Sequence, residues 1–328
     1  VLTAADLIPD LPVWVAVSGS GLVARTPDDG SPVQVPSRPQ DAPLALLAAS
    51  TRDTLYLFAA DGRAVAFPVH QLPEGVAWEG AGAHYADLTP LGRRDTVVAA
   101  VAIPPGRGEA SFGPGIQEHV ANGTPRPYLF MATQRGVVKR VALADLPGVS
   151  SESFTVIGVD EGDALIGAAL TSGEDEVLLV TYAGQAIRFK EGEVRPMGLA
   201  AGGVMGVKLS GPGDRVVALA VARPRSDLLV ATEDGKAKRT PLTEYPTQGR
   251  HGQGVVTARL ADEVGVAGAG VVQSDSTVVL VTEKGAAKTI RARSAPRTSR
   301  PTQGQKVIAL RKGDRVSAVL CPAACART

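Results

Sequence analysis

The chain has 328 residues, of which 44% are hydrophobic and only 4% aromatic, and it carries a formal net charge of +1. This length permits one large domain or two ordinary ones, and the many Val, Ala, Leu and Gly residues suit short strands joined by frequent turns. No apolar run approaches the ~18 residues that a membrane span needs, and the N-terminal stretch lacks the basic region of a signal peptide, so we expect no membrane partner. Both cysteines, Cys321 and Cys325, lie in the last eight residues, and their absence elsewhere fits a reducing cytoplasm.

In chain order, the predicted elements are six β-hairpins. Each combines an apolar strand, a short polar turn with glycine, and a second strand that carries or ends on a basic residue. The glycine supplies the positive φ that a tight hairpin turn needs. The hairpins occupy residues 13–27, 54–67, 128–140, 177–188, 228–241 and 278–289, and their turn glycines are at 21, 62, 136, 184, 235 and 285.

The hairpins repeat with a period near 50 residues. Their turn glycines are 41, 74, 48, 51 and 50 residues apart, and the longest interval contains a Pro- and Gly-rich insertion at about 104–126, which we interpret as a long loop. The period leaves room for two further strands after each hairpin. In the fourth and fifth repeats these further strands are expected at residues 203–209, 215–221, 254–260 and 266–272.

This repeat predicts an all-β fold, a six-bladed β-propeller of four-stranded blades. Blades stacked around one axis bury each other's faces, and a closed ring hides the sheet edges. An open solenoid is the alternative architecture, but no polar capping repeat is evident. We expect a single domain over residues 1–328, a tail over 321–328, and blades that begin near residues 13, 54, 127, 176, 227 and 277.

Charge is distributed unevenly along the chain. Residues 1–125 hold 7 Lys/Arg and 13 Asp/Glu, a net −6, whereas residues 227–328 hold 16 and 9, a net +7. A basic segment beside an acidic one predicts a polyanionic partner that is bound mainly by the C-terminal part.

Five segments at the fourth and fifth repeats carry a family resemblance: Leu170–Val177, Ile187–Glu191, Val194–Gly198, Gly203–Gly206 and Lys238–Pro246. They resemble the C-terminal domain of the DNA gyrase A protein, which is a type IIA topoisomerase component. Phe130–Thr133 with Gly136–Lys139 fits the third blade of that family, and Ala5–Pro9 resembles the segment that opens the domain. The resemblance covers essentially the whole chain, and it is closer in the last four repeats than in the first two.

The resemblance implies a β-pinwheel, a propeller whose neighbouring blades exchange strands, with duplex DNA bent or wrapped along its basic outer rim. It implies a role in ATP-dependent negative supercoiling, with the catalytic tyrosine and the ATPase elsewhere in the holoenzyme. The implied partners are double-stranded DNA, the catalytic core of the same gyrase A protein, and the gyrase B protein of an A2B2 assembly. No cofactor is expected on this chain.

One family feature is missing. Gyrase carries a Gln-Arg-Arg-Gly-Gly-Lys-Gly-like box after the first hairpin, and residues 31–41 contain no such sequence. The nearest related stretches are Gln248–Gly254 and Thr302–Lys306. The absence of the box from the first blade leaves open a topoisomerase IV-like domain that binds DNA without chiral wrapping.

The predicted DNA contacts are cations at the hairpin ends and in the loops that follow, because one repeat position should fall on one rim. Each neutralised phosphate contributes about −0.9 to the slope of log K against log salt. The alternative is that these are solvated charges that protect blade edges. The predicted residues are Arg25, Arg63, Lys139, Arg140, Arg188, Lys190, Arg195, Lys238, Arg239, Arg250, His251, Lys288, Arg291, Arg297, Arg300 and Lys306.

Catalysis on this chain has no support in the sequence. The four histidines lie far apart, and no nucleophile elbow, phosphate-binding loop or metal-ligand spacing occurs. We therefore expect no catalytic or metal site. Two other functions stay open: a regulatory propeller that binds a protein partner, and a propeller enzyme, which would need polar residues gathered at the central channel.

Overall fold

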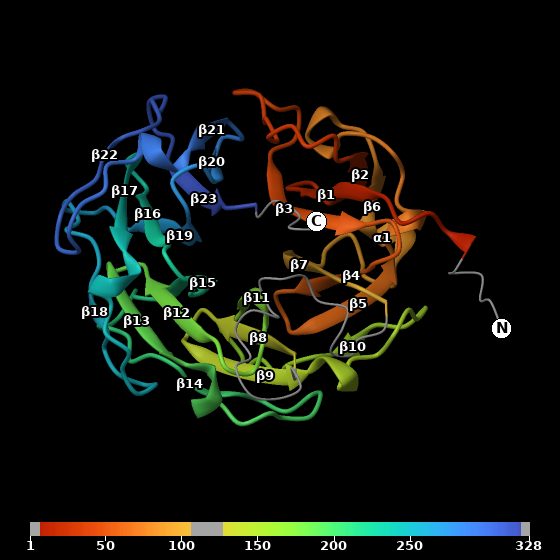
Figure 1. Cartoon of the computed structure of the whole chain (residues 1–328), viewed down its shortest axis with the longest axis horizontal. Coiled ribbons are helices and arrows are strands. Elements are labelled where there is room, and N and C mark those ends of the chain that lie inside the picture. The colour runs from red at the N-terminus through yellow and green to blue at the C-terminus, as the bar shows by residue number, and fades with distance from the viewer. Residues whose placement is uncertain (1–6, 106–126, 323–328) are drawn as a thin grey trace.

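Each of the six hairpins belongs to its own antiparallel sheet, and the sheets are arranged in a ring (Figure 1). The computed structural model describes residues 7–105 and 127–322, and in these residues five sheets have four strands and one has three. The predicted all-β six-bladed propeller is confirmed, and the ring arrangement replaces the open solenoid. The predicted insertion and tail lie almost wholly outside the described residues.

Three strands of each blade come from one repeat. The first hairpin strands are β1 (Pro12–Ser18), β4 (Thr54–Ala59), β8 (Tyr128–Thr133), β12 (Glu176–Thr181), β16 (Asp227–Thr232) and β20 (Thr277–Thr282). The second are β2 (Leu22–Pro27), β5 (Arg63–Pro68), β9 (Val137–Ala142), β13 (Gln185–Lys190), β17 (Lys236–Pro241) and β21 (Ala287–Arg291). The inner strands are β3 (Pro43–Ser50), β7 (Val97–Ile103), β11 (Leu165–Thr171), β15 (Val216–Val221), β19 (Val266–Val272) and β23 (Val316–Leu320).

The fourth, outermost strand of each of blades 1 to 5 comes from the repeat that follows in the sequence. It has only two residues and pairs with the second hairpin strand of the blade that receives it, as Val204 of the fourth repeat does with Val138 of blade 3. The repeat alone suggested that residues 203–209 and 254–260 add a strand to their own blades. The structure shows instead that each adds a short strand to the preceding blade. The exchanged strands are β6 (Ala83–His84), β10 (Phe154–Thr155), β14 (Val204–Met205), β18 (Val255–Val256) and β22 (Gln305–Lys306).

Short helical turns carry the chain toward these exchanged strands. None of the described helices is long and apolar enough to cross a membrane. The 3-10 turns are η2 (Val69–Gln71), η3 (Ala77–Glu79), η4 (Leu143–Asp145), η5 (Glu191–Glu193), η6 (Leu242–Glu244) and η7 (Ala292–Ser294), and the chain before blade 2's inner strand adds α1 (Tyr85–Leu88).

A glycine precedes four of the five exchanged strands because the two backbones approach closely there. A Cβ on Gly304 would lie 2.5 Å from the carbonyl oxygen of Ala237, and one on Gly203 would collide with the carbonyl of Val138. At Gly203 and Gly304 a side chain is thus excluded by the neighbouring backbone.

Blade 6 closes the ring by a different contact. Its sheet has three described strands, β21–β20–β23. The chain after β2 of blade 1 covers the β21 edge: the backbone N–H of Ala287 donates to Ser37 O at 3.2 Å, and Val35 N–H donates to Thr289 Oγ1 at 3.0 Å. Part of the stretch 31–41, which corresponds to the position of the gyrase box, therefore lies on the outer edge of blade 6.

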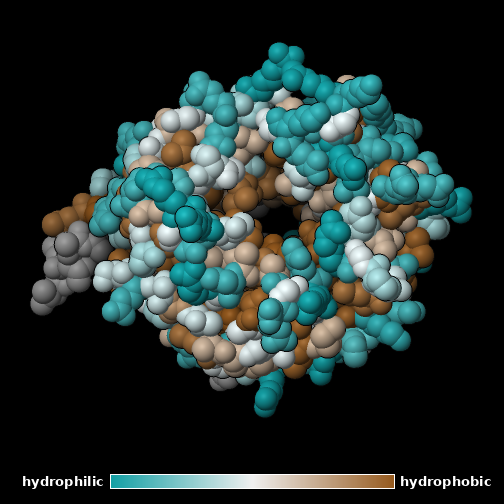
Figure 2. Space-filling view, turned by 180° about the vertical axis from the view of Figure 1, so that it is seen from behind, coloured by the Kyte–Doolittle hydropathy of each residue, from teal (hydrophilic) through white to brown (hydrophobic). Residues whose placement is uncertain are grey.

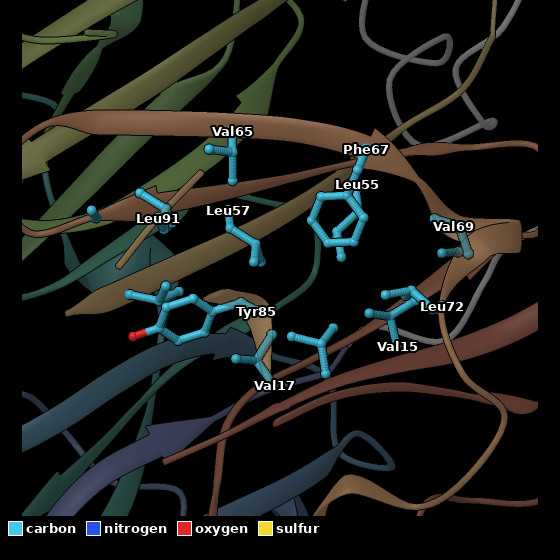
Figure 3. Close-up of a cluster of buried hydrophobic side chains, with 14 of the residues drawn as sticks. Val15, Val17, Leu55, Leu57, Val65, Phe67, Val69, Leu72, Tyr85 and Leu91 are labelled. Carbon is cyan, nitrogen blue, oxygen red and sulfur yellow. The ribbon is translucent and has the colours of Figure 1, made fainter. Parts of the chain in front are cut away.

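The core consists of apolar clusters between adjacent blades. Figure 3 shows the one between blades 1 and 2, where Val15 and Val17 of β1 face Leu55 and Leu57 of β4, with Tyr85 beside them. The six inner strands contain no charged residue, and Figure 2 shows hydrophobic residues around the central opening and hydrophilic ones along the outer edge. The strands that surround the central opening are therefore uncharged.

Candidate nucleic-acid interface

Three loops of the same design lie at the outer edges of blades 3, 4 and 5. They join η5, η6 and η7 to the exchanged strands β14, β18 and β22, and we call residues 195–203, 246–254 and 296–304 the rim loops. Each rim loop lies next to the exchanged segment of the blade before it. The backbone N–H of His251 donates to Gly206 O at 2.8 Å, and that of Arg259 donates to Thr302 O at 3.2 Å. The rim loops are therefore continuous along the perimeter.

Cations follow this line of loops. Two of them, Lys208 and Arg259, were not predicted from the sequence, yet both are exposed and both stand four residues after the first residue of an exchanged strand. That shared offset is the signal that could have identified them. We call the following residues the rim belt: Arg195, Lys208, Arg250, Arg259, Arg297, Arg300 and Lys306.

The belt is bounded by an acidic stretch. Residues 284–312 hold nine Lys/Arg and no Asp/Glu, whereas residues 141–187 hold eight Asp/Glu and no Lys/Arg. Asp160 and Glu161, which follow β10 at the edge of blade 2, are exposed. Exposed negative charge therefore lies at the edge of blade 2, next to the blade 3 end of the rim belt.

Seven of the predicted contacts are exposed. Some of them also touch the protein: Arg250 Nη1 donates to Met205 O at 3.1 Å, and Lys288 Nζ donates to Val307 O at 2.6 Å. His251 has a φ of 66°, in the left-handed region, as does Ala200 at the equivalent position of the preceding loop. The exposed set is Lys190, Arg195, Arg250, His251, Lys288, Arg297 and Lys306.

Four predicted contacts are buried, so the expectation that they reach the rim surface is wrong. Lys139, Arg140, Lys238 and Arg239 are at most 8% exposed. The cause is the strand exchange, because the outer strand and the loop before it come from the next repeat and cover the hairpin end. A single repeat does not reveal this cover.

The arginines four residues after the turn glycine hold the exchanged segment in place. In each case the guanidinium donates to the carbonyl of the residue directly after the 3-10 turn of the following repeat. The pairs are Arg25 with Leu72 at 3.0 Å, Arg140 with Val194, Arg188 with Tyr245 at 3.4 Å, and Arg239 with Ala295 at 3.1 Å. We call these four residues the clamp arginines.

Carboxylates complete the clamps. Arg25 pairs with Glu74 at 2.9 Å, and Arg188 pairs with Glu176. Hydrogen bonds from Thr247 and Arg188 lower the pKa of the Glu176 carboxyl, against the opposing effect of its partial burial. Arg140 also lies over the Tyr128 ring, 4.5 Å from its centroid. These arginines are thus neutralised within the protein.

The last three predicted residues are half-buried. Arg63, in blade 2, pairs with Asp61 at 2.7 Å and Asp95 at 2.6 Å, and these hydrogen bonds raise its pKa. Arg291 Nη1 donates to Asp275 O at 2.9 Å. Arg300 belongs to the rim belt, and its Nε has no hydrogen-bond partner among the described residues.

A family model described as the DNA gyrase C-terminal domain, beta-propeller, matches residues 127–172, 175–223, 226–273 and 276–323. The chain belongs to this family. The DNA gyrase A protein of Klebsiella oxytoca is 34% identical over 96% of the chain and 35% of the relative's own length. The corresponding protein of Mycolicibacterium smegmatis is 32% identical over 96% of the chain and 36% of its own length. The chain thus spans about a third of the length of these relatives.

Solved structures agree with this assignment. The C-terminal domain of DNA topoisomerase IV superposes with a TM-score of 0.74 at 29% identity, covering 95% of this chain and 94% of that one. The DNA gyrase A C-terminal domain gives 0.74 at 19% identity, covering 95% and 100%, which shows the shared fold. All four matched segments of the gyrase-family model fall on blades 3 to 6, and the rim belt lies at the outer edges of blades 3 to 5.

Proposed function

We propose that this gyrase-family propeller binds duplex DNA along the rim of blades 3 to 6 and bends it, as a non-catalytic part of a type IIA topoisomerase. The catalytic core of the gyrase A protein carries out strand passage, and the gyrase B protein hydrolyses ATP. DNA on the rim presents a neighbouring segment to the core and supports negative supercoiling. No cofactor takes part on this domain.

The observation that carries the proposal is the continuous rim belt. The three rim loops and the exchanged segments that follow them bring seven cations to one perimeter, and no acidic residue lies between 284 and 312. Phosphates spaced regularly along a duplex match such a row of cations better than a compact anion does. The described residues form no recognition helix, so we expect binding through the DNA backbone with little sequence preference.

The salt dependence of affinity tests this function. With four to seven phosphate contacts, log K should fall against log salt with a slope of about −4 to −6. The triple variant Arg250→Gln, Arg259→Gln, Lys306→Gln should flatten the slope by about 3. The matched control Arg94→Gln, an exposed cation before β7 in blade 2, should leave the slope unchanged. Absence of binding at low salt would instead favour a regulatory propeller that binds a protein.

A topoisomerase IV-like variant of this function is favoured by one observation. Residues 33–37 cover the β21 edge of blade 6 without the basic box of gyrase. DNA would then bend along the belt without a handed wrap. Nicked circles ligated with the domain bound, and then stripped of protein, distinguish the two: a shifted linking number indicates chiral wrapping, and an unchanged one indicates bending alone.

A further inference from the structure

Lys238 is a buried cation directly beneath the third rim loop. It stands on β17, is 2% exposed, and its ammonium donates to Ser299 O at 2.8 Å, to Arg300 O, and to Thr302 Oγ1 at 3.3 Å. Its three N–H donors therefore have three acceptors, all within four consecutive residues of one loop. The loop is bent around the ammonium.

Lys139 repeats this arrangement two blades earlier. It stands at the equivalent position of β9, is fully buried, and donates to Ala201 O of the first rim loop at 2.8 Å. A second bond, to Val156 O at 2.9 Å, ties the same ammonium to the segment after β10. In the described residues, the ammonium groups of both lysines thus donate to backbone carbonyls and, for Lys238, a hydroxyl, and to no carboxylate.

Blade 4 provides an internal comparison. Its equivalent residue is Ile187, which is fully buried beneath the middle rim loop. There the loop comes close at a glycine: a Cβ on Gly252 would lie 3.3 Å from Ile187 Cδ1. An aliphatic side chain is therefore compatible with the fold at this position, and the lysines of blades 3 and 5 serve something beyond filling the space.

We infer that Lys238 and Lys139 are positioning residues for DNA binding: they hold the carbonyls of their rim loops inward so that the cations of those loops face the duplex. The inference rests on the proposed function. Lys238 and Lys139 do not touch phosphate themselves, since their ammonium groups are enclosed by the loops.

Arg300 is the cation most dependent on this support. Its carbonyl is bound by Lys238, and its N–H donates to Glu244 at 3.0 Å. Its side chain makes only one long bond, from Nη1 to Val256 O at 3.4 Å, and its Nε has no partner among the described residues. The direction of this guanidinium is therefore set by the backbone that Lys238 fixes.

A double-mutant cycle on the 328-residue chain tests the inference, with binding of a random-sequence linear duplex as the measurement. Lys238→Ile, the residue used by blade 4, should weaken affinity about fivefold in the wild-type background and less than twofold beside Arg300→Gln. Lys288→Ile is the control, because Lys288 occupies the same repeat position but is exposed; any loss it causes should add to that of Arg300→Gln. If Lys238→Ile does not fold, Lys238→Met keeps most of the side chain.

Amide hydrogen exchange separates the outcomes. Residues 298–304 of free Lys238→Ile should exchange faster than in the wild type, while the hairpin of blade 5 is unchanged. Additive losses of affinity, or unchanged exchange in the loop, would overturn the inference. Should the wild-type chain not bind DNA, the proposed function fails, while the exchange result still shows whether Lys238 orders the loop.

Discussion

Arg297 Nε donates to both carboxylate oxygens of Asp227 at 3.1 Å, although the two residues are 70 positions apart in the chain. Asp227 begins β16, and the same carboxylate accepts a hydrogen bond from the buried clamp residue Arg239 at 2.8 Å. One acidic side chain thus neutralises a clamp arginine and tethers a rim-belt arginine. It joins the hairpin of blade 5 to the loop that covers that hairpin.

Asp227→Asn should lower the free energy of unfolding by about 3 kcal/mol, because it leaves the charge of Arg239 buried without its carboxylate. Urea denaturation measures this change. Asp275→Asn is the control, since Asp275 pairs with Arg293 where both side chains are more than 60% exposed, and the change should stay within about 0.5 kcal/mol. Equal effects of the two substitutions would show that the buried Asp227 pair contributes no more stability than an exposed one.

Gly304→Ala should destabilise the domain by about 2 kcal/mol or more, because the added methyl group meets the backbone of Ala237 at the point where β22 joins blade 5. Gly198→Ala is the matched control. Gly198 lies in the first rim loop, and a Cβ there would have nothing within 4 Å, so its substitution should be neutral or slightly stabilising. The midpoints of urea unfolding compare the two. Similar midpoints would contradict the close approach at Gly304.

The repeat and its hairpins could be predicted from the sequence because they depend on local patterns. Alternating apolar residues around a glycine define a hairpin and its register, and six copies require mutual burial of their faces. The strand exchange was implied by the family resemblance and not by the repeat. A two-residue strand such as Val204–Met205 has too short a pattern to show which neighbour it joins.

The candidate site was predicted less well, for a physical reason. Whether a strand-end cation is exposed depends on what covers it, and the cover belongs to the next repeat. Arg188 and Arg250 are both predicted contacts in the sequence, yet one is enclosed by Leu242 and Tyr245 carbonyls and the other is exposed. Lys208 was missed because it follows no hairpin.

Stability should rise with pH in the alkaline range because of Lys139 and Lys238. Burial lowers the pKa of each to about 8, from an ordinary 10.5, with Glu244 and Arg300 as the charged neighbours of Lys238. Between these two pH values the unfolded chain binds more protons than the folded one, so the free energy of unfolding increases with pH. Below pH 8 both forms are protonated, and the cost of burying the charge is fully present.

The double variant Lys139→Ile, Lys238→Ile should lose this increase, because isoleucine does not titrate. Urea unfolding at several pH values between 8 and 10.5 gives the comparison, and the difference between wild type and variant removes the contribution of other titrating groups. Parallel curves for the two proteins would contradict a lowered pKa at these lysines.

Replacing a clamp arginine with uncharged glutamine should affect mainly stability, whereas the same change at a rim-belt arginine should affect mainly the salt slope of DNA binding. Arg188→Gln removes hydrogen bonds to Glu176 and to the carbonyl of Leu242, so it should cost about 2 kcal/mol of stability and leave the salt slope of DNA binding unchanged. Arg250→Gln should reduce the slope by about 0.9 and change stability by less than about 0.5 kcal/mol. Urea unfolding and DNA titrations on the same two variants measure both quantities. A reduced slope in Arg188→Gln with unchanged stability would mean that the clamp opens to let its arginine reach phosphate, and the separation of the two groups would then be wrong.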